Sequence, residues 1–402
     1  MSDSTAPLFD WPMARSCPYA PPDLYAEMRQ GPPVKVRVGA ETAWLVTRYD
    51  HVRAVLTDHR FSSDDQLPGF PVRVPLPPEP RVMSFFRMDG PEHSRLRRMA
   101  QTEFTARRTR ALRPVVDALV ARLLDDIEAG PRPVDIVQEY ALALPALVIA
   151  RLFGVPDEEQ GEFTRRSRTI LTPDGDPDEA YAAFVAMTEY LDHLATERRR
   201  SPRDDLLSRL ATRYVATGEL THEDLVAIAR LFLVAGHETT ANQIALSVLS
   251  LLRAPDQLAE LKERPELYTQ AVEESLRYWS IAQDNQVRVA VADVELGGAT
   301  IAAGEGVVLA LPAANHDERV FTDPARFDIH RGDAGRHIAF GHGAHLCPGA
   351  PLARMEIVVA LRELFTRFPT LRLAGYAADG TDVPFRHGHT IVYGLEALYV
   401  TW

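Results

Sequence analysis

Cysteine is scarce in this chain of 402 residues, which contains only Cys17 and Cys347, far apart in the sequence. Two distant thiols make neither a disulfide framework nor a cysteine-rich zinc site. Because unpaired thiols suit a reducing compartment, we expect a cytoplasmic protein.

Long hydrophobic runs are also missing. The longest apolar stretches, near residues 141–153 and 225–235, are too short or too interrupted to span a bilayer. Residues 1–20 lack the continuous apolar core of a secretory signal. Positive charge is not in excess either, since the net charge is −12 at pH 7, which argues against a general nucleic-acid binder. We therefore expect neither a membrane nor a nucleic acid as a partner.

What the sequence does contain is a succession of helical patterns, separated by proline and glycine. It is 46% hydrophobic and 25% charged, as is ordinary for a globular protein with a sizeable core. No repeat or linker divides it, so we expect one domain over residues 1–402. Helices are predicted over residues 22–29, 49–58, 106–129, 136–153, 157–171, 178–200, 203–215, 265–279 and 349–367, with another beginning near residue 89.

Strand patterns are few and short. Alternating residues predict a β-hairpin over 34–48, a small meander over 287–310 and short strands within 371–402. The proline-rich residues 62–82 have no regular pattern and are expected to form a loop that folds over a binding site. The predicted fold class is therefore mainly α, with small β-sheets.

One long helix carries an unusual centre. The segment 221–224 (THED) is a capping signature, and the helix that it begins can extend to about Ala254, before Pro255. Both ends of this helix are apolar, but residues 236–240 read GHETT. Polar groups inside a buried helix cost roughly 1–3 kcal/mol each when they are unpartnered, and glycine is a poor helix former. Local violations of this kind indicate a functional or strained site.

Residues 340–349 (FGHGAHLCPG) end an irregular segment and begin a helix. Gly341 and Gly343 permit backbone angles that other residues avoid, and Pro348 suits a first helical position. Cys347 at this helix start would face unpaired amides, whose partial positive charge favours a thiolate. Such a turn can hold one sulfur rigidly against a metal.

Two further motifs are ambiguous when taken alone. His93 and Arg97 lie one turn apart on a helix that Asp89 or a neighbour can cap, and such a pair can bind a carboxylate or a phosphate. A solvated basic face is the simpler interpretation of that segment. Likewise, Glu274 and Arg277 at i and i+3 are typical of an ion pair on a helix surface.

Taken together, these motifs resemble those of the cytochrome P-450 monooxygenases, in the order and at the separations usual in that family. The stretch Phe340-Gly341-x-Gly343-x-x-x-Cys347-x-Gly349 resembles the haem-binding signature, and residues 235–240 (AGHETT) resemble the oxygen-activating motif.

Three other segments complete the resemblance. Glu274-x-x-Arg277 is similar to the ExxR pair, and residues 324–327 (PARF) are similar to the segment that supplies it with a second arginine, here Arg326. Residues 89–97 match the propionate-binding helix of bacterial members. The sequences of several segments (AGHETT, LARME, VTW) are similar to those of actinobacterial enzymes that act on secondary metabolites or xenobiotics.

The resemblance implies a triangular prism of helices, with haem b between the long central helix and the cysteine-bearing helix. Cys347 would be the thiolate ligand of the iron, and Phe340 would shield its sulfur from water. Charge-assisted bonds from a set of cations would hold the propionates. The residues expected to bind the cofactor are His93, Arg97, Ala235, Gly236, Arg288, Phe340, Gly341, His345, Cys347 and Gly349.

The resemblance also assigns the catalytic residues and a supporting network. Glu238 and Thr239 would deliver protons during oxygen activation, whereas His237 would face away from the haem. A buried network of Glu274, Arg277 and Arg326 would lie behind the haem. The substrate walls would come from residues 62–88, 165–190, 231–235, 281–286 and 385–392.

Electrons are expected from outside, because no flavin or nicotinamide fingerprint is present. The expected donor is an iron–sulfur ferredoxin with an NAD(P)H-dependent reductase, docking on a basic patch of Arg95, Arg98 and Arg354. The expected reaction is hydroxylation or epoxidation of a mid-sized organic substrate with O2, by a monomer.

Other functions compete with this one. The same fold can catalyse oxidative coupling or use peroxide, and a haem-binding sensor would show no turnover. The Glu238–Thr239 pair argues against peroxide specialisation and against a sensor, since a sensor needs no proton relay. A zinc protein is disfavoured by the missing companion ligands.

Overall fold

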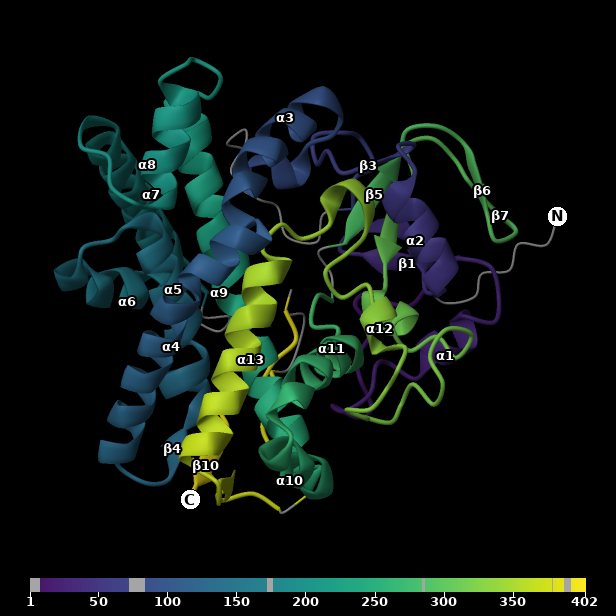
Figure 1. The fold of residues 1–402 in the computed structure, drawn as a ribbon. Coiled ribbons are helices and arrows are strands. Elements are labelled where there is room, and N and C mark those ends of the chain that lie inside the picture. Colours follow the sequence, from purple (N-terminus) through teal and green to yellow (C-terminus); the bar gives the residue numbers. More distant parts are fainter. Residues whose placement is uncertain (1–7, 72–83, 172–175, 284–285, 378, 387–391) are drawn as a thin grey trace.

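The computed structural model describes residues 8–71, 84–171, 176–283, 286–377, 379–386 and 392–402 (Figure 1). Of the loop predicted over residues 62–82, residues 72–82 therefore lie outside the described residues, as does most of the predicted 385–392 substrate wall. The expectation of one domain over the whole chain stays a prediction.

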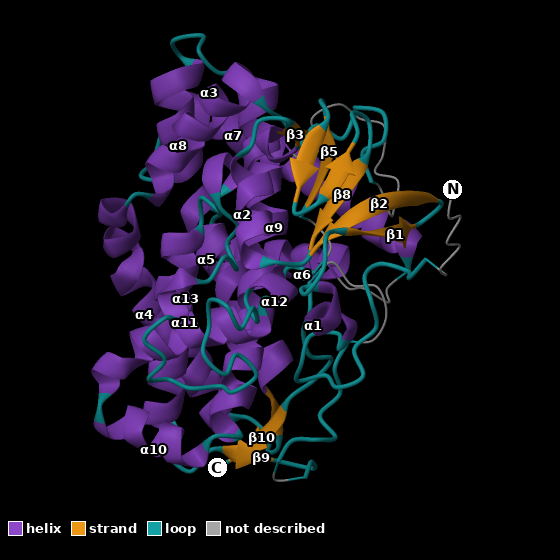
Figure 2. Cartoon of the chain, turned by 90° about the vertical axis from the view of Figure 1, so that its right-hand side faces the viewer, coloured by secondary structure: helices purple, strands orange, loops and turns teal. Residues whose placement is uncertain are grey.

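Helices make up one side of the molecule, and the larger sheet lies on the other side with α1 and α2 (Figures 1 and 2). The described α-helices are α1 (Leu24–Met28), α2 (Tyr49–Thr57), α3 (Gly90–Gln101), α4 (Ala106–Ala129), α5 (Ala143–Phe153), α6 (Gln160–Leu171), α7 (Pro177–Arg200), α8 (Leu206–Leu210), α9 (His222–Leu252), α10 (Pro255–Glu263), α11 (Tyr268–Trp279), α12 (Leu311–Ala314) and α13 (Ala350–Arg367). The largest hydrophobic core fills the space among α4, α5, α9, α11 and α13.

The central helix α9 confirms the capping signature. The Thr221 hydroxyl accepts the backbone N–H of Asp224 at 3.0 Å, and Pro255 begins α10 after α9 has ended at Leu252. Among the described residues, no helix is both long and apolar enough to cross a membrane.

The predicted helices over 136–153 and 203–215 are only partly α-helical, because each contains a π-helical turn. Residues Val137–Ala141 form a π-helical turn before α5, and Ala211–Val215 form another after α8. Single π-helical turns of this kind are rare and often lie at functional sites.

The predicted hairpin is confirmed, but the predicted meander is wrong in its pairing. Strands β1 (Val34–Val38) and β2 (Glu41–Val46) are antiparallel. The larger sheet has the order β1-β2-β8-β5-β3, with β3 (Phe61–Ser62) at one edge. Strand β5 (Val287–Ala290) pairs with β8 (Gly306–Leu309). The strands between them, β6 (Val294–Leu296) and β7 (Ala299–Ile301), form a separate hairpin, because Gly297 and Gly298 both adopt positive φ and turn the chain back.

The short C-terminal strands pair with a strand that was not predicted. Strand β10 (Tyr399–Thr401) lies between β9 (Arg372–Leu373) and β4 (Val134–Asp135), which precedes the π-helical turn before α5. This small sheet lies at the lower end of the molecule in Figure 1.

A buried carboxyl within α13 limits stability at neutral pH. Glu356 is 4% exposed, and its Oε2 atom has no hydrogen-bond partner among the described residues. Burial raises the pKa of Glu356 to about 8. The folded state therefore favours the neutral carboxyl. The free energy of unfolding decreases as the pH rises from the unfolded pKa of roughly 4.3 toward the folded pKa of about 8.

We predict that Glu356→Gln removes this loss. Between about pH 5 and 8, the free energy of unfolding of the native chain should fall relative to that of the variant, by up to roughly 1.4 kcal/mol per pH unit. Urea unfolding at a series of pH values measures the difference. Glu363→Gln, on the same helix but partly exposed, is the matched control. A pH-independent difference for Glu356→Gln would contradict the prediction.

Candidate functional site

Cys347 lies in the turn that precedes α13. Its backbone N–H donates to the Phe340 carbonyl at 2.9 Å, which closes the turn. Gly341 and Gly343 have φ angles of +76° and +70°, and a Cβ atom at position 343 would collide with the carbonyl oxygen of Leu56. These two positions therefore require glycine.

The side chain of Cys347 is partly exposed. Burial raises the pKa of the Cys347 thiol, whereas the backbone N–H groups of Gly349 and Ala350 and the guanidinium of Arg97 lower it. These donors stabilise a thiolate. A bound metal cation would add its own positive charge and favour the thiolate further.

Four cationic or ionisable side chains from three segments gather beside this turn. They are His93 and Arg97 of α3, Arg288 of β5, and His345. The rings of His93 and His345 stack at a centroid distance of 4.2 Å, and Arg97 donates to the Leu346 carbonyl. The structure thus brings together residues that are separated by up to about two thirds of the chain.

This cluster has more positive groups than acidic partners. His93 is 3% exposed and its Nε2 atom has no partner among the described residues. Burial lowers the pKa of His93 to about 4 and that of Arg288 to about 10. The Arg288 guanidinium donates to the Val287 carbonyl at 2.7 Å and forms no ion pair among the described residues, although the charge of Asp89 acts on it and raises its pKa.

The donor set therefore fits the haem that the resemblance implies. Arg97 and Arg288 form no ion pair with a carboxylate among the described residues, and buried cations or an orphaned imidazole nitrogen are costly unless an anionic group completes them. A ligand with two carboxylates and a metal would satisfy the cations and the sulfur together.

Asp89 does not cap α3 with its side chain, although the sequence predicts that it can. It is the N-cap residue of α3, but its side chain makes no capping bond. It accepts instead from the Ser62 hydroxyl and the Ser63 amide, both at 2.6 Å, and from His345 Nε2 at 3.2 Å. Asp89 thereby orients His345 rather than capping the helix.

The middle of α9 presents the predicted acid and alcohol. Ala235 is exposed within a helix that is otherwise largely buried, whereas Glu238 and Thr239 are half-buried. The Thr239 hydroxyl donates to the Ala235 carbonyl at 2.6 Å. A side chain at Gly236 would approach Ile149 Cδ1 at 3.2 Å, so this glycine permits close packing of α9 on α5.

Glu238 has a partner that the sequence did not reveal. Arg386, 148 residues away, forms an ion pair with its carboxylate at 2.5 Å, and both side chains are mostly buried. Burial raises the pKa of Glu238, and Arg386 opposes that rise. Because nothing local to residue 386 marks it, only the tertiary structure reveals this contact.

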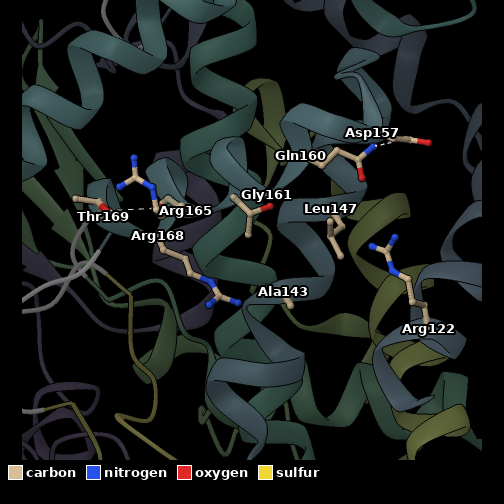
Figure 3. Close-up of a pocket in the computed structure, with 10 residues that line it drawn as sticks. Arg122, Ala143, Leu147, Asp157, Gln160, Gly161, Arg165, Arg168 and Thr169 are labelled. Carbon is tan, nitrogen blue, oxygen red and sulfur yellow. Dashed lines mark hydrogen bonds between the residues drawn. The ribbon is translucent and has the colours of Figure 1, made fainter. Parts of the chain in front are cut away.

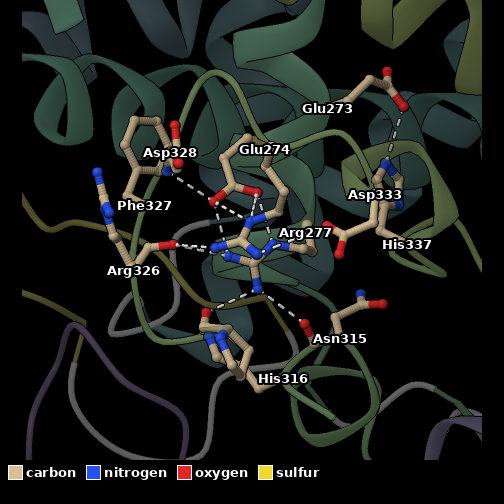
Figure 4. Close-up of polar contacts among 12 residues, drawn as sticks. Glu273, Glu274, Arg277, Asn315, His316, Arg326, Phe327, Asp328, Asp333 and His337 are labelled. Carbon is tan, nitrogen blue, oxygen red and sulfur yellow. Dashed lines mark hydrogen bonds and ion pairs between the residues drawn. The ribbon is translucent and has the colours of Figure 1, made fainter. Parts of the chain in front are cut away.

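The ExxR pair is a buried network, shown in Figure 4. The Arg277 guanidinium binds Glu274 with contacts of 2.7 and 2.9 Å, and both residues are fully buried. Arg277 also donates to the carbonyls of Asn315 at 3.0 Å and Pro324 at 2.9 Å. The network thus ties α11 to the turn-rich segment before the cysteine turn.

The second arginine of this network is Arg331, and the prediction of Arg326 is wrong. Arg331 Nε lies 3.0 Å from Glu274 and its side chain is buried. The Arg326 side chain is exposed and points away, and only its carbonyl contributes, accepting from Arg331 at 2.8 Å. The chain turns sharply between Pro324 and Arg331, so sequence position alone did not identify the inward side chain.

The predicted docking patch is largely neutralised. Arg95 binds Glu92 at 2.7 Å, and Arg354 binds Glu273 at 2.6 Å while lying over the Phe340 ring. Arg98 alone of the three is exposed without an ion-pair partner among the described residues. His337 also contacts Glu273, at 3.2 Å, as suits a structural histidine.

A separate pocket of about 550 Å³ opens between α4, α5 and α6 (Figure 3). It shares no residue with the cysteine turn or its cations. Two of its polar side chains are already engaged: Arg165 binds Glu162 outside the pocket, and Asp157 accepts from Gln160 within the lining.

Comparisons with known proteins agree over nearly the whole chain. A family model described as cytochrome P-450 matches residues 23–372. Mycinamicin VIII C21 methyl hydroxylase from Micromonospora griseorubida is 44% identical over 400 residues, which cover 98% of this chain and 99% of that protein. Pentalenic acid synthase from Streptomyces avermitilis is 43% identical over 397 residues, 98% of this chain and 97% of that protein. The crystal structure of cytochrome P-450 MoxA from Nonomuraea recticatena has a TM-score of 0.91 and 42% identity, with 98% of each chain covered.

The corrected network yields a test. Arg331→Ala leaves the buried Glu274 carboxylate short of one partner and should lower the free energy of unfolding by about 3–5 kcal/mol. Arg326→Ala removes an exposed side chain and keeps the carbonyl, so its effect should stay within about 0.5 kcal/mol. Urea unfolding of both variants measures this, and equal losses would contradict the assignment of Arg331.

Proposed function

This chain belongs to the cytochrome P-450 family, and we propose that it uses electrons from an iron–sulfur ferredoxin to insert oxygen into a mid-sized organic substrate by hydroxylation or epoxidation. The fold class and the monooxygenase class expected from the sequence are both confirmed by the family. The observation that supports the finer proposal is the occurrence, in one chain, of a cluster of cationic and ionisable side chains beside Cys347 and an acid–alcohol pair on α9.

We assign haem b to the site that Cys347 and the neighbouring cations form. Enzymes of this family hold haem iron through a cysteine thiolate, whose electron donation favours cleavage of the O–O bond. Cys347 would bind the iron, and His93, Arg97, Arg288 and His345 would hold the propionates. The remaining predicted contacts are Ala235, Gly236, Phe340, Gly341 and Gly349.

We assign proton delivery to Glu238 and Thr239. The raised pKa of Glu238 suits a carboxyl that both accepts and donates protons. Arg386 holds this carboxylate from the C-terminal segment. The Thr239 hydroxyl, bonded to the Ala235 carbonyl in the structure, would need only a rotation about its side-chain bond to donate to a group bound beside α9.

The acid–alcohol pair also weighs against the alternatives. A haem-binding sensor has no use for a proton relay, and peroxide supplies its own protons. Oxidative coupling shares every feature of the site with hydroxylation, so product analysis separates these two outcomes.

Relatives indicate the substrate class and setting. Two of them are named for mycinamicin VIII and pentalenic acid, so we propose a secondary metabolite as the substrate. We further propose a monomer that works in the cytoplasm and receives its electrons through an NAD(P)H-dependent ferredoxin reductase.

For ferredoxin docking we propose a surface on α3 and α4. The exposed Arg98 of α3 is followed by Arg107 and Arg110 at the start of α4, also exposed and without an ion-pair partner among the described residues. Ferredoxins are acidic, so these arginines would attract them.

The central proposal predicts that Thr239→Ala uncouples the enzyme. Without the hydroxyl, protons should arrive at the wrong stage, so most electrons should yield peroxide while haem content stays native. Peroxide and product per NAD(P)H consumed, in a system reconstituted with ferredoxin and reductase, measure this. Thr239→Ser keeps the hydroxyl and should restore coupling. Full coupling in Thr239→Ala would show that the relay lies elsewhere.

The docking surface predicts a salt-dependent effect of charge reversal. Arg98→Glu should slow the first electron transfer from reduced ferredoxin by roughly tenfold at low salt, and less at high salt, because salt screens exposed charges. Arg122→Glu is a matched control, since it lies on α4 about 18 Å beyond Arg110 by helical rise. Stopped-flow reduction measures both, and equal rates would remove this surface.

A further inference from the structure

Arg15 is a half-buried arginine whose partners are all neutral. Its Nε and Nη2 atoms donate to the side-chain oxygen of Gln283 at 3.3 and 3.2 Å, and its Nη1 atom donates to the Ala20 carbonyl at 3.0 Å. Its guanidinium also lies over the ring of Tyr393, 3.8 Å from the centroid. The Tyr393 hydroxyl in turn donates to the Pro18 carbonyl at 2.6 Å. The N-terminal segment therefore contacts two segments from the last third of the chain.

The charge of Arg15 is unfavourable in this setting. Burial lowers the pKa of Arg15, yet an arginine stays charged at pH 7, and it forms no ion pair among the described residues. A neutral side chain would fill the same space at less cost, and local violations of this kind indicate a functional position. What a guanidinium adds is a rigid, planar fork of donors that can contact two segments at once.

The two segments that Arg15 contacts are weakly joined to each other. The Tyr393 backbone N–H donates to the Ile281 carbonyl at 2.8 Å, and Ala282 forms an isolated antiparallel bridge with Val392. An isolated bridge fixes the spacing of two segments less firmly than a ladder of several, because each backbone hydrogen bond contributes only about 1 kcal/mol. A side chain that contacts both segments therefore has a large effect on their spacing.

The segment that contains Tyr393 borders the candidate site. Gly394 lies so close to α9 that a Cβ atom there would collide with Asn242 Oδ1. The Gly394 carbonyl accepts the amide of Arg386 at 3.0 Å, and Arg386 binds Glu238. The junction that is held from the N-terminus thus leads directly to the middle of α9.

We propose that Arg15 is a positioning residue for substrate binding, because it holds residues 281–283 and 392–393 at a fixed spacing beside the site. A large ligand then meets a preformed wall, which raises its affinity, since binding need not order the wall. A small ligand that reaches only the haem iron gains nothing from this contact. The inference rests on the proposed haem site and adds to it a preference for large ligands.

The test compares three variants of the haem-loaded chain. Arg15→Ala removes the fork, and Arg15→Lys keeps the charge but cannot contact Gln283 and the tyrosine ring in the same way. Arg253→Ala is the matched control. Arg253 also lies over a tyrosine of the N-terminal segment, Tyr19, at 3.5 Å, and it donates to the Asp379 carbonyl at 2.5 Å. These contacts are of the same kinds as those of Arg15, but they involve neither segment of the junction.

The measurement is the ratio of the dissociation constants of 4-phenylimidazole and imidazole, each titrated by the haem spectrum. In Arg15→Ala the dissociation constant of 4-phenylimidazole should rise roughly fivefold, and that of imidazole should change by less than about twofold. Arg15→Lys should lie between the native chain and Arg15→Ala, and Arg253→Ala should keep the native ratio. A general loss of stability would not affect the two azoles differently, so the ratio reports positioning.

A native ratio in Arg15→Ala, or an equal change in Arg253→Ala, would overturn the positioning role and leave the haem site intact. If Arg15→Ala fails to load haem, Arg15→Lys decides the question, and a native ratio in that variant would contradict the proposal. A native chain whose haem spectrum responds to neither azole would instead overturn the proposed haem site, and this inference with it.

Discussion

The geometry of the site depends on hydrogen bonds that hold one sulfur atom at the start of α13. The Phe340 carbonyl closes the turn by accepting the Cys347 amide, and the amides of Gly349 and Ala350 point at the sulfur. Glycine at 341 and 343 lets the chain make this turn against Leu56. The surrounding cations could act on one ligand together with this sulfur only if the sulfur stays in place.

A second constraint acts on the opposite element, α9. A long buried helix tolerates polar residues only where each has a partner. His237 is satisfied by α5 and α6, and Glu238 is satisfied by Arg386. These partners stabilise the helix and, in doing so, connect the middle of α9 to α6 and to the C-terminal segment.

The sequence was informative where the chemistry is local. The capping signature of α9, the glycines of the cysteine turn and the spacing of His93 and Arg97 are contiguous patterns, and each predicted its element correctly. Long-range contacts were not predictable in this way. Arg331 replaces Arg326 because a turn decides which side chain points inward, and Arg386 reaches Glu238 across 148 residues. Asp89 binds His345 instead of its own helix for a similar reason. The assigned roles of the site residues stay predictions.

The central claim is that Cys347 is the thiolate ligand of a haem iron. The most direct test is the absorption spectrum of the dithionite-reduced, carbon-monoxide-bound protein, together with that of Cys347→Ser. The claim predicts the strongly red-shifted Soret band of thiolate ligation in the native chain and its loss in the variant. A correctly folded, haem-loaded native chain without that band, or a variant that keeps it, would contradict the claim.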